Sequence, residues 1–164
     1  MTLSNEFLNY LKQKEGYRRF VYTCPAGKET IGYGHVLIND ENYQKIDEFI
    51  AEKLLMQDID KIQCKLHTFV GDLSNNLQQN EYEAILSLLY NWGVSRFIPS
   101  KLAKSLKEGN KEQAAHEFLN ICNVNGKPCR GLQIRRYEEM LVFKYGWDAL
   151  KVLGQIKCDN KFIF

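Results

Sequence analysis

The sequence contains no long apolar run and carries little net charge. No stretch approaches the roughly 18 to 20 apolar residues that a membrane span requires, so we expect no stable membrane insertion. The formal net charge is +2, which permits contact with an anionic polymer but is far below the dense basic patch of a nucleic-acid-binding protein. The sequence therefore indicates a globular protein, and its 164 residues are enough for one domain with a sizeable core.

The N-terminus also lacks the basic segment, the continuous apolar segment and the small-residue cleavage site of a signal peptide. Residues 4–14 predict instead a short amphipathic helix, with Ser4 as its cap and Gly16 as its stop signal. We therefore expect the protein to be made in the cytoplasm without a recognisable leader.

The cysteine spacing does not match a disulfide framework. The cysteines are an odd number and irregularly spaced, which favours free, reduced thiols. They are Cys24, Cys64, Cys122, Cys129 and Cys158. The alternative is a bridge between Cys122 and Cys129, which flank NVNGKP and could close this loop under oxidation.

Two kinds of periodicity divide the chain. Aromatic and β-branched residues broken by glycine and proline between Arg18 and Ile38 predict short antiparallel strands, and CPAG predicts a turn with Pro25 second and Gly27 fourth. From Asp47, the expected cap, the pattern becomes helical. Further helices are expected at 79–92, 99–107, 110–121, 131–143 and 146–153.

This pattern predicts an α+β fold in a single domain, 1–164, in which a long helix joins a small lobe of short antiparallel strands to a larger helical lobe. The expected parts are a β-containing lobe at 15–47, a connecting helix at 48–66, and a helical lobe from 1–14 and 67–164.

The spacing of the glycine, histidine and cysteine residues does not indicate a phosphate-binding or metal-binding site. GYGH lacks the third glycine and the following helix of a dinucleotide-binding fingerprint, and the Walker pattern is absent. His35, His67 and His116 lie far apart, and neither HExxH nor CxxC occurs. We expect no metal and no other cofactor, and we interpret His35 as a hydrogen-bonded residue that anchors the strands.

A carbohydrate site is the third possibility. Glycoside hydrolysis needs a protonated carboxylic acid beside the leaving oxygen and a second group on the opposite face of the sugar. Glu15, at the end of the first helix and just before the strands, could be that acid. A single glutamate near a helix end is more often a solvated charge, so its position alone does not decide between the two interpretations.

KEGYRRFVY followed by TIGYGH resembles the phage-type lysozymes, the endolysin and muramidase group known as glycoside hydrolase family 24. AEKLLMQDID resembles the connecting helix of that family, LLYNWGVSRF its helix ending in Asn-x-Gly, and GLQIRRYEEMLVF its Arg-Arg helix. These matches occur in the family's order and cover nearly the whole chain.

The resemblance implies a phage-lysozyme fold with a sugar-binding cleft between the lobes. It also implies hydrolysis of the β-1,4 bond between N-acetylmuramic acid and N-acetylglucosamine in peptidoglycan, without a cofactor. The expected partner is the peptidoglycan glycan strand, and nucleic acid is not expected. The protein would be a monomer, made in the cytoplasm of a bacterial host and acting on the cell wall after release.

The family pattern E-x8-D-x5-T places Glu15 and Thr30 in the site but puts Cys24 where the family has aspartate. A thiolate could replace the aspartate as nucleophile or electrostatic partner, provided that its surroundings lower the thiol pKa. Alternatively, Cys24 is a spectator while Thr30 holds the water, or the site has lost activity. The intact Glu15, Thr30 and GYGH argue against loss.

The resemblance also implies supporting and substrate-binding roles. Arg135 is expected to reach Glu15, and His35 is expected to pair with Asp58 on the connecting helix. The candidate substrate-binding residues are Gly34, Asn91 and Ser100. For Asn91 the alternative is a cap on its own helix end.

Two other function classes stay open. A lytic transglycosylase uses one glutamate and needs no second carboxylate, and a non-catalytic protein would bind the wall without cleaving it.

Overall fold

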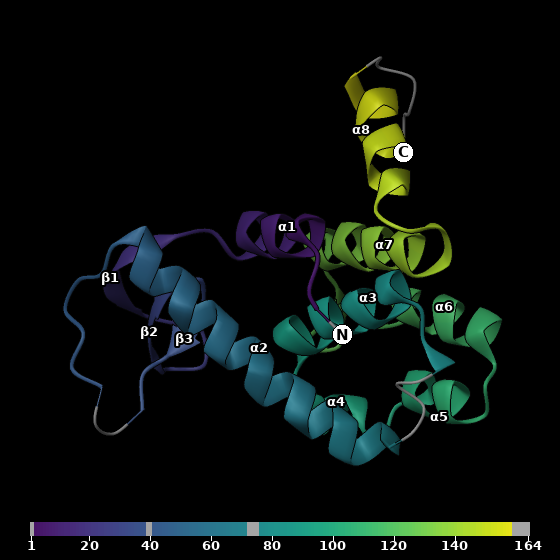
Figure 1. Cartoon of the computed structure of the whole chain (residues 1–164), viewed down its shortest axis with the longest axis horizontal. Coiled ribbons are helices and arrows are strands. Elements are labelled where there is room, and N and C mark those ends of the chain that lie inside the picture. The colour runs from purple at the N-terminus through teal and green to yellow at the C-terminus, as the bar shows by residue number, and fades with distance from the viewer. Residues whose placement is uncertain (1, 39–40, 72–75, 159–164) are drawn as a thin grey trace. The chain divides into compact units, whose positions relative to one another are not determined.

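The computed structural model describes residues 2–38, 41–71 and 76–158. The chain divides into two compact units, Thr2–Cys64 and Lys65–Phe164, here called the N-terminal unit and the C-terminal unit. In Figure 1 the N-terminal unit runs from purple to blue, and the C-terminal unit from teal to yellow. No helix in the described ranges is long and apolar enough to cross a membrane.

The first helix, α1 (Asn5–Glu15), confirms the expected amphipathic helix. The Phe7 backbone N–H donates to the Ser4 hydroxyl at 3.1 Å, which caps the first turn. Gly16 ends the helix with φ 70° while its N–H donates to the Lys12 carbonyl. This geometry leaves Glu15 as the last helical residue, directly before the strands.

Three short strands form an antiparallel sheet in the order β1 (Arg18–Thr23), β2 (Glu29–Gly32) and β3 (His35–Val36). Figure 1 shows them beside the first turns of α2. The CPAG turn between β1 and β2 is confirmed, because the Gly27 N–H donates to the Cys24 carbonyl at 2.8 Å.

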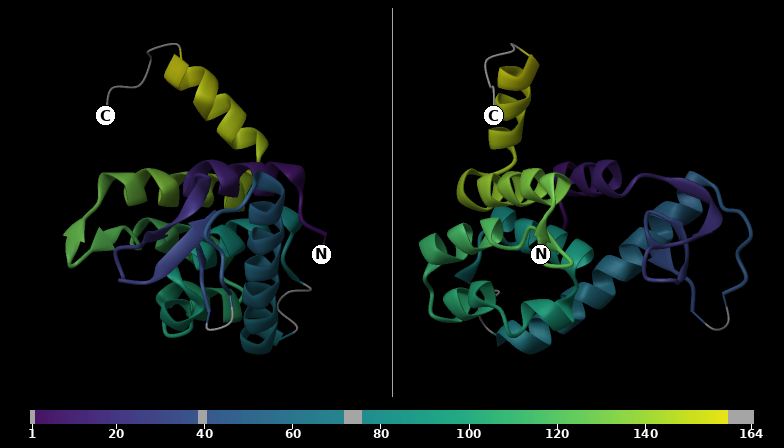
Figure 2. Two further views of the ribbon diagram at one scale, coloured as in Figure 1. Left: turned by 90° about the vertical axis from the view of Figure 1, so that its left-hand side faces the viewer. Right: turned by 180° about the vertical axis from the view of Figure 1, so that it is seen from behind.

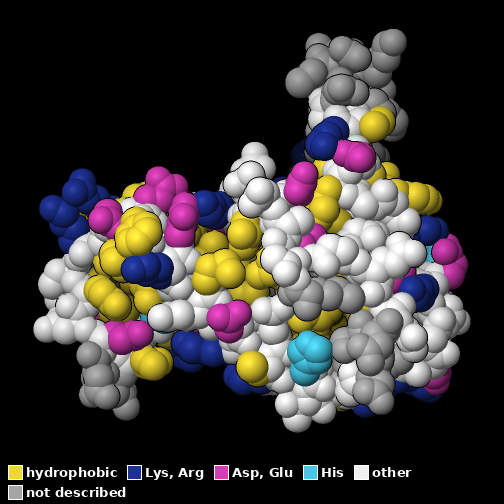
Figure 3. All heavy atoms as spheres, viewed as in Figure 1, with side chains coloured by type: hydrophobic (Ala, Val, Ile, Leu, Met, Phe, Trp, Pro, Cys, Tyr) yellow, Lys and Arg dark blue, Asp and Glu magenta, His cyan; other side chains and the backbone are white. Residues whose placement is uncertain are grey.

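The outer surface of the N-terminal unit carries exposed aromatic and aliphatic side chains, visible in Figure 3 among charged ones. Phe20 is 61% exposed and Phe49 is 63% exposed. The Arg19 guanidinium carbon lies 6.0 Å from the Phe20 ring centre, and the Lys53 ammonium lies 4.3 Å from the Phe49 ring centre. The quadrupole of an aromatic ring attracts a cation placed over its face, so each of these rings makes a cation–π contact.

The long helix α2 (Glu48–Val70) begins where expected, because the Asp47 carboxylate accepts the Ile50 N–H at 2.8 Å. Leu55 and Ile59, four residues apart on this helix, are each 1% exposed. The helix continues to residue 70, beyond the expected end at residue 66.

In the C-terminal unit, α3 (Gln79–Trp92) has the predicted bounds and is buried along its middle. It packs against α7, and α6 packs against α5 and α7, as Figure 2 shows. The remaining helices are α4 (Val94–Phe97), α5 (Lys101–Lys107), α6 (Lys111–Leu119), α7 (Arg130–Tyr145) and α8 (Asp148–Cys158). The short α4 was not expected, and α8 begins and ends later than the predicted 146–153.

A second, two-stranded sheet was also not expected from the sequence. It pairs β4 (Asn123–Val124) with β5 (Lys127–Pro128). Asn125 and Gly126 join them with φ values of 50° and 77°. Two positive φ angles define the type I′ turn that Asn-Gly favours, so this hairpin had a local sequence signal.

The cysteines outside the C-terminal end of α8 carry free thiols. They are Cys24, Cys64, Cys122 and Cys129. We also expected a free thiol at Cys158, but the side chain of this residue lies outside the described part of the structure.

Candidate active site

Most of the candidate residues lie in the N-terminal unit, and the rest lie in the C-terminal unit. The first group is Glu15, Cys24, Thr30, Gly34, His35 and Asp58, and the second is Asn91, Ser100 and Arg135.

The pairing of β1 and β2 brings Cys24 and Thr30 to one face of the sheet. Tyr22 on β1 lies directly opposite Thr30 on β2. The Cys24 N–H donates to the Lys28 carbonyl at 2.9 Å, which extends the ladder by one residue. Because alternate strand residues and directly opposite residues share a face, Tyr22, Cys24 and Thr30 point to the same side.

Hydrogen bonds around the half-buried Cys24 lower the pKa of its thiol. The largest effect comes from the backbone N–H of Lys28, followed by the backbone N–H of Ala26 and the hydroxyl of Thr30. The Lys28 charge acts in the same direction, whereas desolvation opposes it. Hydrogen-bond donors near the sulfur favour the thiolate, which is the form that a nucleophilic or charged Cys24 needs.

Thr30 connects this sulfur to the turn. The residue is 2% exposed, and its hydroxyl donates to the Lys28 carbonyl at 3.0 Å. The same hydroxyl lies within hydrogen-bonding reach of the Cys24 sulfur. It has one proton to donate, and in this structure that proton goes to the Lys28 carbonyl.

Glu15 is half-buried and shares an electrostatic neighbourhood with Cys24. Burial raises the pKa of the Tyr22 phenol, the negative charges of Cys24 and Glu15 add to this effect, and Arg18 opposes it. The Arg18 guanidinium carbon lies 5.8 Å from the Tyr22 ring centre. Tyr22 therefore lies within charge–charge range of both the acid and the thiol.

Tyr22 was not among the residues expected in the site. The alternation of side chains along β1, which places residues 22 and 24 on one face, could have indicated it.

Gly34 lies in the turn between β2 and β3 with φ 91°. Residues other than glycine rarely adopt this left-handed backbone conformation, so the backbone alone explains why glycine occupies position 34. Close approach of a sugar to this backbone stays a prediction.

His35 confirms the predicted pairing with Asp58. The imidazole is 2% exposed, and its Nδ1 lies 2.7 Å from the Asp58 Oδ2. Its Nε2 lies 2.9 Å from the Glu41 Oε2, a second carboxylate that the sequence did not indicate. The hydrogen bond to Asp58 raises the pKa of His35, and the Glu41 bond adds to it while burial opposes it. His35 thus joins β3 to α2 and to the segment that contains Glu41.

Arg135 lies in a buried charged cluster between α3 and α7. Its Nε donates to the Glu139 carboxylate at 3.1 Å, and its Nη2 donates to the Ser87 carbonyl at 3.3 Å. Arg136 is 0% exposed and lies 2.8 Å from the other oxygen of Glu139. The expected contact of Arg135 with Glu15 joins residues of the two units and stays a prediction.

Asn91 is exposed, and its side-chain oxygen accepts a hydrogen bond from the Arg136 Nη2 at 2.5 Å. The Gly93 backbone N–H, not the Asn91 side chain, closes the end of α3 by donating to the Leu89 carbonyl. The amide oxygen therefore orients a buried arginine, and a role in substrate binding stays a prediction.

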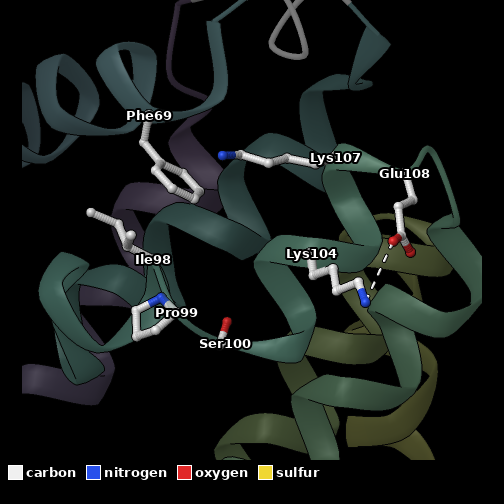
Figure 4. Close-up of a pocket in the computed structure, with 7 residues that line it drawn as sticks. All are labelled: Phe69, Ile98, Pro99, Ser100, Lys104, Lys107 and Glu108. Atoms are coloured by element: carbon white, nitrogen blue, oxygen red, sulfur yellow. Dashed lines mark ion pairs between the residues drawn. The ribbon is translucent and has the colours of Figure 1, made fainter.

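Ser100 caps α5, because its hydroxyl accepts the Ala103 N–H at 3.1 Å. It also lines a pocket of about 420 Å³ within the C-terminal unit. Figure 4 shows the Lys107 side chain reaching toward the Phe69 ring across this pocket, with the ammonium 3.8 Å from the ring centre. The local helix cap explains Ser100 without a ligand, and its role in substrate binding stays a prediction.

The chain is similar to a phage endolysin and to solved lysozyme and muramidase structures. The chain is 37% identical over 148 residues to the endolysin of Acyrthosiphon pisum secondary endosymbiont phage 1, with 88% of this chain and 99% of that protein covered. The structure of a P22 lysozyme mutant matches with a TM-score of 0.76 at 30% identity, covering 88% of this chain and 99% of the other.

The muramidase domain of SpmX from Asticaccaulis excentricus matches with a TM-score of 0.75 at 27% identity, covering 87% and 97% of the two chains. The family model described as phage lysozyme matches residues 12–139, which include Glu15, Cys24 and Thr30. The chain therefore belongs to the phage lysozyme family.

Proposed function

We propose that this protein is a lysozyme that hydrolyses the β-1,4 bond between N-acetylmuramic acid and N-acetylglucosamine and thereby lyses the bacterial cell wall. Its relatives are an endolysin, a lysozyme and a muramidase domain. The observation that carries the proposal is the match of residues 12–139 to the phage lysozyme family, a range that includes Glu15, Cys24 and Thr30. The charges of Glu15 and Cys24 both act on Tyr22, and an acid together with an anionic group on the opposite face of the sugar is what glycoside hydrolysis requires.

In the proposed reaction, the Glu15 carboxylic acid donates its proton to the glycosidic oxygen as that bond breaks. Positive charge then develops at the anomeric carbon, and the Cys24 thiolate stabilises it or forms a bond to that carbon. Thr30 orients the sulfur or the attacking water through its hydroxyl. The Glu15 carboxylate finally accepts a proton from the water that completes hydrolysis.

The surface of the N-terminal unit suits the same substrate class. Peptidoglycan is an anionic polymer of sugars, and aromatic rings beside cations offer contacts to both features. Phe20 with Arg19 and Phe49 with Lys53 are exposed pairs of this kind in the N-terminal unit.

A turbidity assay on cell walls tests the catalytic proposal. Glu15→Gln is expected to abolish clearing, and Cys24→Ala and thiol alkylation are each expected to reduce it strongly. Cys64→Ala is the matched control, because Cys64 is an exposed cysteine on α2 and is expected to leave clearing unchanged. Full activity of both Cys24→Ala and alkylated protein would make Cys24 a spectator.

Cys24→Asp separates the two possible roles of the thiolate. An electrostatic or carboxylate-compatible role predicts that Cys24→Asp retains activity that Cys24→Ala loses. Trapping of a glycosyl group on the Cys24 sulfur, detected by mass spectrometry of the intact protein, would identify a nucleophile.

A lytic transglycosylase is the second candidate, because Cys24 replaces the carboxylate that hydrolases of this family use. Mass spectrometry of digested peptidoglycan distinguishes the two: reducing ends indicate hydrolysis, and anhydro-muramyl ends indicate transglycosylation. A non-catalytic wall-binding protein would sediment with sacculi without clearing them.

We further propose that the protein acts as a monomer on the wall after release from the cytoplasm in which it is made. Size-exclusion chromatography with light scattering tests the monomer. Clearing by protein added from outside, compared with protein expressed inside intact cells, tests the need for release.

A further inference from the structure

Outside the candidate active site, the β4–β5 hairpin brings two cysteines face to face. Its register pairs Val124 with Lys127 and Asn123 with Pro128. Cys122 and Cys129 are the next residues outward, and the Cys129 N–H donates to the Cys122 carbonyl at 2.9 Å. This bond places the two cysteines opposite each other just beyond the paired strands, and opposite residues of a hairpin point to the same side.

The alternation of the ladder agrees with this register. Hydrogen-bonded and non-hydrogen-bonded pairs alternate along an antiparallel ladder. The pair that contains Pro128 is of the second kind, in which the missing N–H costs nothing. The next pair outward, Cys122 and Cys129, makes one of the two hydrogen bonds of a hydrogen-bonded pair. In a regular pair of that kind the Cα atoms lie about 5.5 Å apart, within the roughly 4.4–6.8 Å span of disulfides.

We propose that Cys122 and Cys129 form a dithiol site that a small-molecule disulfide, such as glutathione disulfide, oxidises to an intramolecular bridge. The thiolate of one cysteine attacks the disulfide, forms a mixed disulfide and displaces one glutathione thiolate. The second cysteine attacks the bonded protein sulfur and displaces the other glutathione. Two protein thiols are oxidised, one disulfide is reduced to two thiols, and the protein's two thiol protons pass to the glutathione products.

Both side chains are half-buried, so they retain partial access to such a reagent. The Ile121 backbone N–H donates to the Phe118 carbonyl of α6, and the Cys129 carbonyl accepts the Gln133 N–H of α7. The bridge would therefore join the end of α6 to the beginning of α7. Hydrogen-bonded cross-strand pairs hold their Cβ atoms farther apart than non-hydrogen-bonded pairs do. The bridge therefore forms under strain and is readily reduced again.

Peptide mapping tests the proposal on the folded full chain. After incubation with glutathione disulfide, remaining thiols are alkylated and the protein is digested with trypsin. Trypsin does not cleave before Pro128, so Cys122 and Cys129 stay on one peptide. The expected product is this peptide, lighter by two hydrogens and free of alkyl groups. Its complete alkylation after treatment, or glutathione on both cysteines without a bridge, would overturn the proposal.

Single variants provide the matched controls. Cys122→Ser and Cys129→Ser are each expected to trap glutathione on the remaining cysteine, whereas Cys64→Ser is expected to form the bridge as the wild type does. Cys122→Ala and Cys129→Ala serve the same purpose if a serine variant fails to fold. Phenylarsine oxide, which chelates two neighbouring thiols, is expected to bind about a hundredfold more weakly to any single variant of the pair.

The turn supplies an independent test. Gly126 has φ 77°, and a Cβ added there meets no atom within 4 Å, so Gly126→Ala acts on the backbone conformation alone. This variant is expected to form the bridge about fivefold more slowly, because alanine disfavours the left-handed conformation. An unchanged rate would show that the hairpin register does not bring the thiols together.

Discussion

Asp58→Asn removes the charge that holds the buried imidazole of His35. The pair spans β3 and α2, with 2.7 Å between the His35 Nδ1 and the Asp58 Oδ2. A hydrogen bond to a charged group contributes roughly 1.5–3 kcal/mol. Asp58 is 21% exposed and Glu41 still contacts the ring, so the low end of this range applies. We expect a loss of about 1.5–2 kcal/mol in the free energy of unfolding when His35 is protonated.

The effect depends on pH in a defined direction. The carboxylates raise the pKa of His35 in the folded protein above its ordinary value of 6.5. The stabilisation is therefore complete below the unfolded-state pKa and is lost as the pH rises through the folded-state pKa. Asp58→Asn should be most destabilising at mildly acidic pH and much less so well above neutrality.

Urea unfolding at several pH values, followed by circular dichroism, measures this prediction. Asp60→Asn on the same helix is the control, because Asp60 is exposed and is expected to change stability little. A double-mutant cycle with His35→Gln isolates the coupling between the two side chains. Coupling below about 0.5 kcal/mol at acidic pH, or a loss independent of pH, would refute the reasoning.

Three further predictions concern the charged cluster, the α5 cap and the thiol. Glu139→Gln leaves the guanidinium groups of Arg135 and Arg136 without their shared carboxylate in a buried site, and we expect a loss of about 3–5 kcal/mol in urea unfolding. A loss below about 1 kcal/mol would contradict this. Ser100→Ala is expected to cost about 1 kcal/mol through the lost cap, and a fall in kcat/KM of the folded variant would indicate an additional contact with substrate. Wall clearing by the wild type should fall as the pH drops below the lowered pKa of Cys24. In Cys24→Asp the same loss of activity should occur at lower pH. If activity falls at the same acidic pH in both proteins, a working thiolate is contradicted.

Local signals made several elements predictable. Ser4 and Gly16 mark the two ends of α1, and Pro25 and Gly27 mark the turn after β1. These features depend on residues a few positions apart, so their physical cause is contained in a short stretch of sequence. The Asn125-Gly126 turn was equally local, and it was missed although its sequence favours a hairpin.

The sequence by itself determined the fold class, because helical period, caps and turn chemistry act over short distances. Its resemblance to the phage lysozymes, and not its periodicity, indicated Glu15 and Cys24 as candidates for the acid and the thiol. Only the tertiary structure decided the surroundings of those residues. It placed the N–H groups of Lys28 and Ala26 at the Cys24 sulfur, Tyr22 near both Cys24 and Glu15, and Glu41 on His35. Such partners depend on which strands pair and on which residue outside the helices and strands contacts the buried His35 ring. Residue spacing within a short stretch of sequence does not specify these contacts.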